Sequence, residues 1–137
     1  MKRVIAIVAM LWISACGNDP VAPSADWLLH SWRFDEGGCW PEIIITPETL
    51  GYDLSFRLAG TGDAEIRHNA QLFERQRFTA QYRSNPFGGP KILILEFERA
   101  LLMSTHSFRA QQEQPGQLLL SDWAGTDGCG FRFVGVD

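Results

Sequence analysis

The 137-residue chain lacks an apolar run long enough to cross a bilayer as a helix, and it lacks an excess of basic residues. The apolar run at residues 4–13 has about ten residues, whereas a membrane-spanning helix needs about 20. Sixteen acidic and twelve basic residues give a net charge of −4, which argues against nucleic acid as a partner. A chain of this length fits one compact domain.

Catalytic motifs are also missing. The sequence has no glycine-flanked serine elbow, no phosphate-binding loop and no paired-histidine helix motif. The acids at expected strand ends are most simply solvated charges: Asp35, Glu36, Glu96 and Glu98. Nearby arginines are expected to form exposed ion pairs of small energetic weight: Arg33, Arg99 and Arg132. We therefore expect a protein that is not an enzyme and needs no cofactor.

The N-terminus has the organisation of an export signal. Lys2 and Arg3 precede the apolar run, and Ile13-Ser14-Ala15-Cys16 follows it. This segment resembles the lipobox of bacterial lipoproteins. The resemblance implies that Cys16 receives a diacylglycerol, that residues 1–15 are removed, and that the new amine is acylated. The alternative is an ordinary secretory signal with a chance cysteine.

The resemblance also predicts where the protein is located. Residue 17 is glycine rather than the aspartate that favours inner-membrane retention in that family, which implies an outer-membrane lipoprotein facing the periplasm. Residues 16–26 are expected to be the lipidated cysteine and a flexible tether, and residues 27–137 a single folded domain. Loss of the leader lowers the net charge from −4 to −6. The lipid, rather than the protein surface, is therefore expected to hold the chain at the membrane.

Two cysteines remain once Cys16 is assigned to lipid. In an oxidising compartment Cys39 and Cys129 are expected to form a disulfide. Two free thiols, or a metal pair completed by a histidine, are the alternatives. No closely spaced cysteines or histidines support zinc.

Alternating apolar residues predict β-strands. Tyr52, Leu54, Phe56 and Leu58 alternate with polar residues, so one face of this strand is expected to be buried. Helical spacing is hard to find. Eight strands are predicted, at residues 28–34, 52–58, 64–68, a segment containing Phe78, 91–97, 101–109, 118–121 and 131–136. Residues 43–46 are a possible additional strand.

Eight short strands joined mostly by tight turns favour an antiparallel up-and-down barrel, with a β-sandwich as the alternative. In such a barrel the first and last strands are neighbours, and Cys39 follows one while Cys129 precedes the other. Residues 28–34, with Trp32, resemble the opening strand of the lipocalin-like domains of small bacterial lipoproteins, members of the calycin group. The resemblance implies that Trp32 closes one end of the barrel.

Candidate binding residues lie in two connections expected at the other end. Trp40, Ile44 and Trp123 are predicted to form an apolar mouth or lid. Packing of each tryptophan on its own domain is the alternative.

The strand alternation also places three histidines toward the core face: His30, His68 and His106. They are a conceivable metal site, although local hydrogen bonding is the simpler interpretation.

These observations predict a lipid-anchored binding module for a small apolar ligand or an envelope protein. One alternative is a structural or assembly factor that works through a strand edge or through residues 92–95, which are apolar on both faces. Another is a hydrolase inhibitor that presents the loop at residues 85–90. An apolar cavity inside the barrel favours carriage of a ligand, whereas a filled interior favours a role for the surface.

Overall fold

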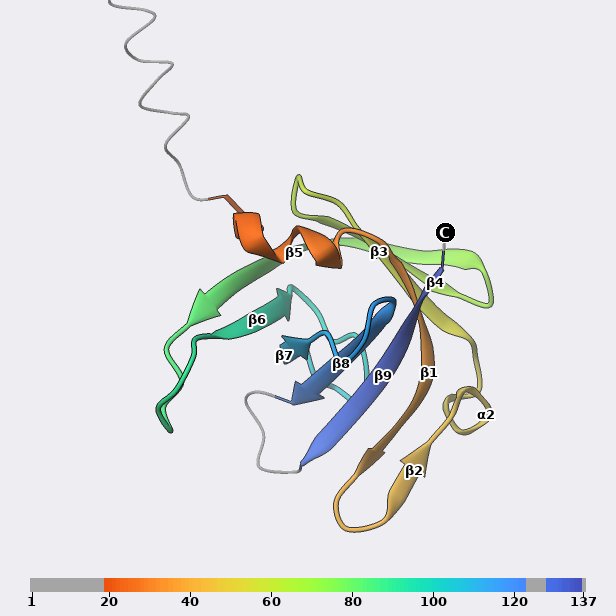
Figure 1. The fold of residues 1–137 in the computed structure, drawn as a ribbon. Coiled ribbons are helices and arrows are strands. Elements are labelled where there is room, and N and C mark those ends of the chain that lie inside the picture. The colour runs from red at the N-terminus through yellow and green to blue at the C-terminus, as the bar shows by residue number, and fades with distance from the viewer. Residues whose placement is uncertain (1–18, 123–127, 137) are drawn as a thin grey trace, which may run out of the picture.

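A computed structural model describes residues 19–122 and 128–136 of the chain. The described residues form a closed antiparallel barrel of eight strands with one additional strand, β2 (Figure 1). Two short helices are the 3-10 helix η1 (Pro23–Leu28) and α2 (Pro47–Leu50). The strands are β1 (Ser31–Cys39), β2 (Ile43–Ile45), β3 (Leu54–Leu58), β4 (Asp63–His68), β5 (Gln71–Arg83), β6 (Ile92–Phe97), β7 (Ser107–Gln111), β8 (Gln117–Asp122) and β9 (Cys129–Val136).

Pairing of the first and last strands closes the barrel. β1 and β9 are antiparallel along their whole lengths, from Ser31 opposite Val136 to Cys39 opposite Cys129. The two cysteines form a disulfide at the end of this pairing, as the sequence predicted. The remaining barrel strands follow one another in chain order, so the predicted up-and-down topology is confirmed.

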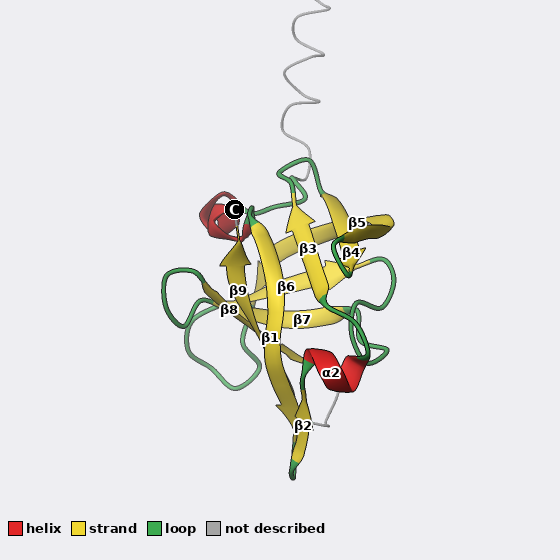
Figure 2. Ribbon diagram, turned by 90° about the vertical axis from the view of Figure 1, so that its right-hand side faces the viewer, coloured by secondary structure: helices red, strands yellow, loops and turns green. Residues whose placement is uncertain are grey.

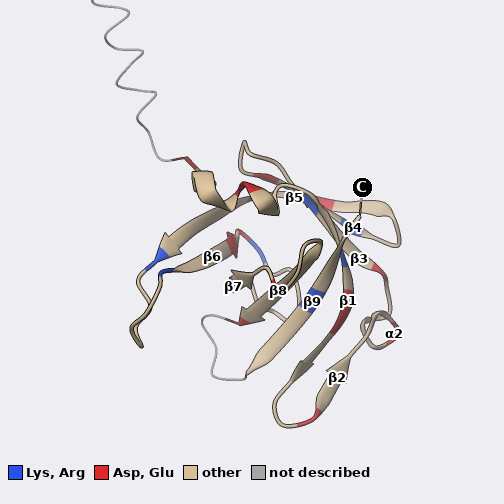
Figure 3. Ribbon diagram, viewed as in Figure 1, with Lys and Arg blue, Asp and Glu red and all other residues tan. Residues whose placement is uncertain are grey.

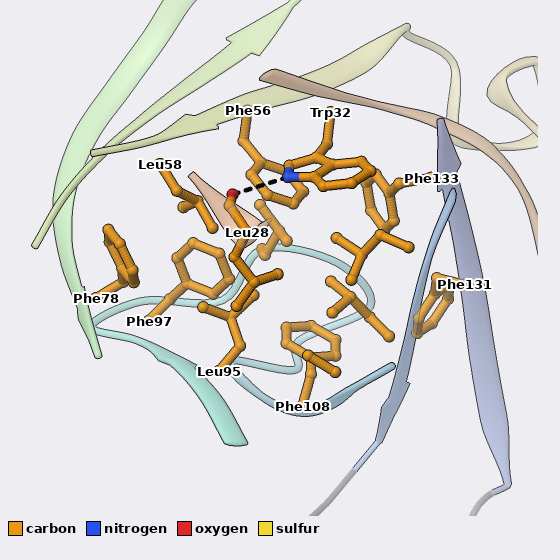
Figure 4. Packing of buried hydrophobic residues seen from close by; sticks show 14 of the residues in the cluster. Leu28, Trp32, Phe56, Leu58, Phe78, Leu95, Phe97, Phe108, Phe131 and Phe133 are labelled. Atoms are coloured by element: carbon orange, nitrogen blue, oxygen red, sulfur yellow. Dashed lines mark hydrogen bonds between the residues drawn. The ribbon is translucent and has the colours of Figure 1, made fainter. Parts of the chain in front are cut away.

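Aromatic side chains fill the interior of the barrel. Eight strands leave a space just wide enough for side chains, and here seven large aromatic residues are less than 2% exposed. The ring of Phe56 packs against two others, with centroids 5.0 Å from Phe133 and 5.9 Å from Phe97 in edge-to-face geometry (Figure 4). The fully buried aromatic residues are Trp32, Phe34, Phe56, Phe97, Phe108, Phe131 and Phe133.

The N-terminal residues of the described chain pack on the barrel instead of forming a tether. Val21 pairs in parallel with Ala80 of β5, and Ala25 of η1 is fully buried. Trp32 lies beside Leu28, the last residue of η1, and its Nε1 donates a hydrogen bond to the Leu28 carbonyl at 3.0 Å (Figure 4). The expected domain start near Trp27 was therefore too late, because small residues let the preceding segment fit against β5.

Two strand boundaries also differ from those predicted. Leu28 belongs to η1 rather than to the first strand, which begins at Ser31. Residues 101–106 form a turn before β7, although Leu101 and Leu102 are buried. Leu101 and Leu102 were assigned to a strand because they are apolar, but they are buried without having strand geometry. The spacing of apolar residues indicates burial more directly than it indicates backbone conformation.

Candidate functional site

The principal candidate site is the hairpin formed by β1 and β2. β1 is nine residues long, and only its first three residues pair with β3. Its last three residues pair instead with β2, which forms no other strand pairing among the described residues. The hairpin therefore projects past the barrel wall (Figure 2).

Two consecutive glycines allow strands to approach β1 from both sides. A Cβ atom at Gly37 would lie 2.7 Å from the carbonyl oxygen of Gly130 in β9. A Cβ atom at Gly38 would lie 2.7 Å from the carbonyl oxygen of Ile43 in β2. Both distances are too short for a real Cβ contact, so larger residues would push the neighbouring strands away. Since the disulfide also joins Cys39, the last residue of β1, to β9, the hairpin is held against β9 as far as its turn.

The end of the hairpin presents apolar side chains to solvent. Trp40 is 80% exposed, Ile43 56% and Ile44 71%, whereas Ile45 faces the core. After β2 the chain turns into α2, where Thr46 caps the helix by accepting a hydrogen bond from the backbone N–H of Thr49. The apolar surface is therefore carried by an ordered hairpin that is anchored at both ends.

The predicted binding residues are thus only partly brought together. Trp40 and Ile44 lie on the same hairpin, and the Trp40 backbone N–H donates to the carbonyl of Gly128 beside β9. Trp123 lies outside the described residues, as does Cys16. The hairpin does not open into a ligand cavity, because the interior beside it is filled by the aromatic core.

A stack of three rings lies at the same end of the barrel and was not anticipated. Tyr52 stacks on His68 with centroids 4.0 Å apart, and Phe73 stacks on the other face of His68 at 3.9 Å. Phe73 is the extra residue where the register of β4 and β5 shifts, and this bulge directs its ring onto His68. Burial lowers the pKa of His68 below its usual value of 6.5, although the charge of Glu74 acts in the opposite direction.

The expectation that the three histidines face the core was wrong. His30 and His106 are exposed and lie outside the strands, and His68 is only partly buried. In the ranges 19–122 and 128–136, no group of histidine, cysteine or acidic side chains could hold a metal ion. The histidines are therefore not brought together as a metal site.

A second exposed apolar group lies between β5 and β6. Phe87 is 96% exposed at the tip of this connection, and its backbone N–H donates to the Asn85 side chain. By contrast, Ile92 and Ile94 are buried, with Gln81 and Arg109 as the cross-strand neighbours of Ile94. The apolar run of β6 is therefore not an open surface, which removes the observation behind an assembly role for it.

Neither η1 nor α2, the helices of the described ranges, is long and apolar enough to cross a membrane. Comparison with protein-family models, with curated proteins and with solved structures finds no match for this chain.

Proposed function

We propose that this protein is a lipid-anchored module of the cell envelope that binds a partner protein through the β1–β2 hairpin. The observation that carries the proposal is the exposure of Trp40, Ile43 and Ile44 on a braced hairpin. Large apolar side chains gathered on one ordered projection are typical of interaction sites, and tryptophan is enriched among residues that dominate binding energy.

The packed interior favours a protein partner over a small apolar ligand. A carrier of apolar molecules needs an internal pocket of several hundred cubic ångströms lined by apolar side chains. In this barrel the corresponding space holds the side chains of Phe56, Phe97, Phe108 and Phe131. Binding through the outside of the fold is therefore the simpler mechanism.

The backbone of β2 offers a second means of recognition. Residues 43–45 pair with β1 on one side, and no backbone hydrogen bond reaches their other side from within the described ranges. An extended segment of a partner can add to such an edge through main-chain hydrogen bonds while apolar side chains provide further contact. The hairpin thus combines a strand edge with three exposed apolar residues.

The position of the N-terminus supports binding through the β1–β2 hairpin. The first described residues and the β1–β2 hairpin lie at opposite ends of the molecule in two perpendicular views (Figures 1 and 2). Only Gly17 and Asn18 separate Cys16 from Asp19, a span of at most about 11 Å for three extended residues. If Cys16 is acylated and faces the periplasm at the outer membrane, the hairpin points away from the bilayer toward other envelope proteins.

Site-specific photo-crosslinking in intact cells tests the proposal. A photoreactive residue at Ile44 should yield a discrete protein adduct that disappears when Trp40→Ala is added, while the same residue at Phe87 should yield none. The Trp40→Ala variant should melt within about 2 °C of the parent chain, because the exposed ring contributes little to the core. Absence of an adduct at Ile44 would overturn the proposal, and a large fall in melting temperature would favour the packing interpretation of Trp40.

The same experiment separates a second candidate function. Phe87 at the tip of the β5–β6 connection is suited to insertion into a cleft, as a hydrolase inhibitor requires. An adduct at Phe87 but not at Ile44 would favour that function. Acylation is tested separately by labelling with a fatty-acid analogue, which Cys16→Ser should abolish.

A further inference from the structure

Two adjacent cross-strand rows on the outer wall of the barrel, over β1, β3, β4 and β5, carry an excess of positive charge. Cross-strand registers place Arg57 opposite Glu65 and Glu65 opposite Arg75, while Arg33 and Arg67 lie on either side of β3 in the next row. These strands lie side by side in Figure 3, where their arginines are blue. These two rows hold four arginines and one carboxylate, although the chain as a whole is acidic.

The Glu65 carboxylate does not neutralise the charge of these four arginines. Glu65 lies 3.6 Å from a guanidinium nitrogen of Arg67 and 3.5 Å from one of Arg75, so two cations share it. Arg33 and Arg57 have no ion pair or side-chain hydrogen bond to any residue that the structure describes. The exposed pair expected for Arg33 is therefore not formed.

One-to-one ion pairs lie on either side of this region along the sheet. Arg77 is paired with Asp63 at 2.8 Å, and Arg132 with Glu36 at 2.8 Å. In each pair one carboxylate is matched to one guanidinium. Arg33 and Arg57, the unpaired cations of the two rows, thus lie between these pairs.

A hollow of about 240 Å³ lies within this wall. Ser31, Ser55, Arg57, Glu65 and Arg67 contribute to its lining. Both serines are half-buried, and within the described ranges neither hydroxyl has a hydrogen-bond partner. Two guanidinium groups and two hydroxyl groups therefore supply hydrogen-bond donors to one small concave surface, which we call the arginine hollow.

We propose that the arginine hollow binds a phosphate group. Guanidinium groups donate paired hydrogen bonds to phosphate oxygens, and hydroxyl groups add single ones. A carboxylate is satisfied by one guanidinium fork, whereas a phosphate can accept from several donors around it at once. The hollow is smaller than a typical pocket for a drug-sized ligand, so it fits a phosphate with the part of a sugar or lipid next to it. This site is separate from the β1–β2 hairpin and does not depend on the function proposed for it.

The test uses residues 16–137 carrying Cys16→Ser, so that neither an acyl group nor the apolar leader contributes to vesicle binding. Inorganic phosphate is titrated into ¹⁵N-labelled protein and followed by amide shifts. Vesicles of phosphatidylcholine with about 20 mol% phosphatidic acid are tested by co-sedimentation, with pure phosphatidylcholine as the blank. The site variant is Arg57→Gln with Arg67→Gln. Its matched control is Arg83→Gln with Lys91→Gln, which removes two exposed cations next to the β5–β6 connection.

Saturable binding of either probe should weaken at least about tenfold in the site variant and less than about twofold in the control. In the parent chain the amide shifts should centre on β3 and β4. Binding of vesicles alone would identify a lipid headgroup as the source of the phosphate, and binding of inorganic phosphate would identify a soluble one. Equal weakening in both variants, or no saturable binding of either probe, would overturn the proposal.

Discussion

Removal of the disulfide should destabilise the whole barrel, not only the hairpin beside it. Cys39 and Cys129 are 90 residues apart, so the bond closes a loop that contains most of the folded chain. In the chain-entropy model, a loop of this size stabilises the folded state by about 4 to 5 kcal/mol. That is a large share of the ~5 to 15 kcal/mol by which a typical domain is stable.

This magnitude converts into a measurable change in melting temperature. Unfolding of roughly 115 residues carries an entropy near 0.24 kcal/mol/K, so the loss corresponds to about 15 to 20 °C. The variant is Cys39→Ala with Cys129→Ala, and thermal and urea unfolding are followed by circular dichroism. The urea m-value should rise, because an unfolded chain without the crosslink exposes more surface.

Reduction of the disulfide in the parent chain provides the chemical control. Reductant should lower the stability of the parent chain toward that of the variant and leave the variant unchanged. A loss of less than about 1.5 kcal/mol with an unchanged m-value would refute the reasoning, since the bond would then not constrain the unfolded chain.

Three further predictions concern single residues. Trp32→Phe should cost about 1 to 3 kcal/mol in urea unfolding, because it removes a buried hydrogen bond and part of a buried ring, although the His30 N–H still donates to the carbonyl of Leu28. Gly37→Ala should cost a similar ~1 to 3 kcal/mol, since its Cβ would meet a backbone oxygen of β9, whereas Gly135→Ala should be nearly neutral. The pKa of His68 is lowered in the folded state, so the unfolded chain takes up a proton first as the pH falls below 6.5. The contribution of neutral His68 to stability is therefore present above pH 6.5 and lost on acidification. In His68→Phe, the unfolding free energy should fall less between about pH 7.5 and 5.5 than it does in the parent chain.

The alternation of apolar and polar residues predicted the strands correctly where one face of the sheet is buried in the core and the register has no bulge. Leu54, Phe56 and Leu58 are buried, and Ser55 and Arg57 between them are not. The cysteine pairing was also predictable, because barrel closure makes the first and last strands neighbours. In both cases a simple geometric rule relates position in the sequence to position in space.

The errors occur where that rule is interrupted. Alternation placed His30 and His106 in the core, but both residues precede the strands to which they were assigned. It could not place the ring of Phe73 on His68, because the bulge depends on the register of β5 against β4. A bulge leaves no reliable mark in the sequence of one strand, since the extra residue is defined only by its partner strand.

The arginine hollow was missed for a related reason. Each arginine alone looks like an ordinary solvated charge, and the sequence predicts that it pairs with a nearby acid. Whether it does so depends on which residues face it across the sheet. Arg132 has Glu36 beside it and pairs, whereas Arg33 lies between Val134 and Ser55 and does not.

The packing of the barrel determines where any binding site can be. Inward-facing residues of an eight-stranded barrel meet at its centre, and here large aromatic rings fill that space. Binding residues must then come from the outer face or from a strand that extends beyond the wall. β1 provides both, because Arg33 lies on the wall and Trp40 follows the segment that continues past β3. Gly37, Gly38 and the disulfide hold this extension between β9 and β2, so they matter for stability and for the binding proposed for the hairpin, whereas the arginine hollow lies at the opposite end of β1.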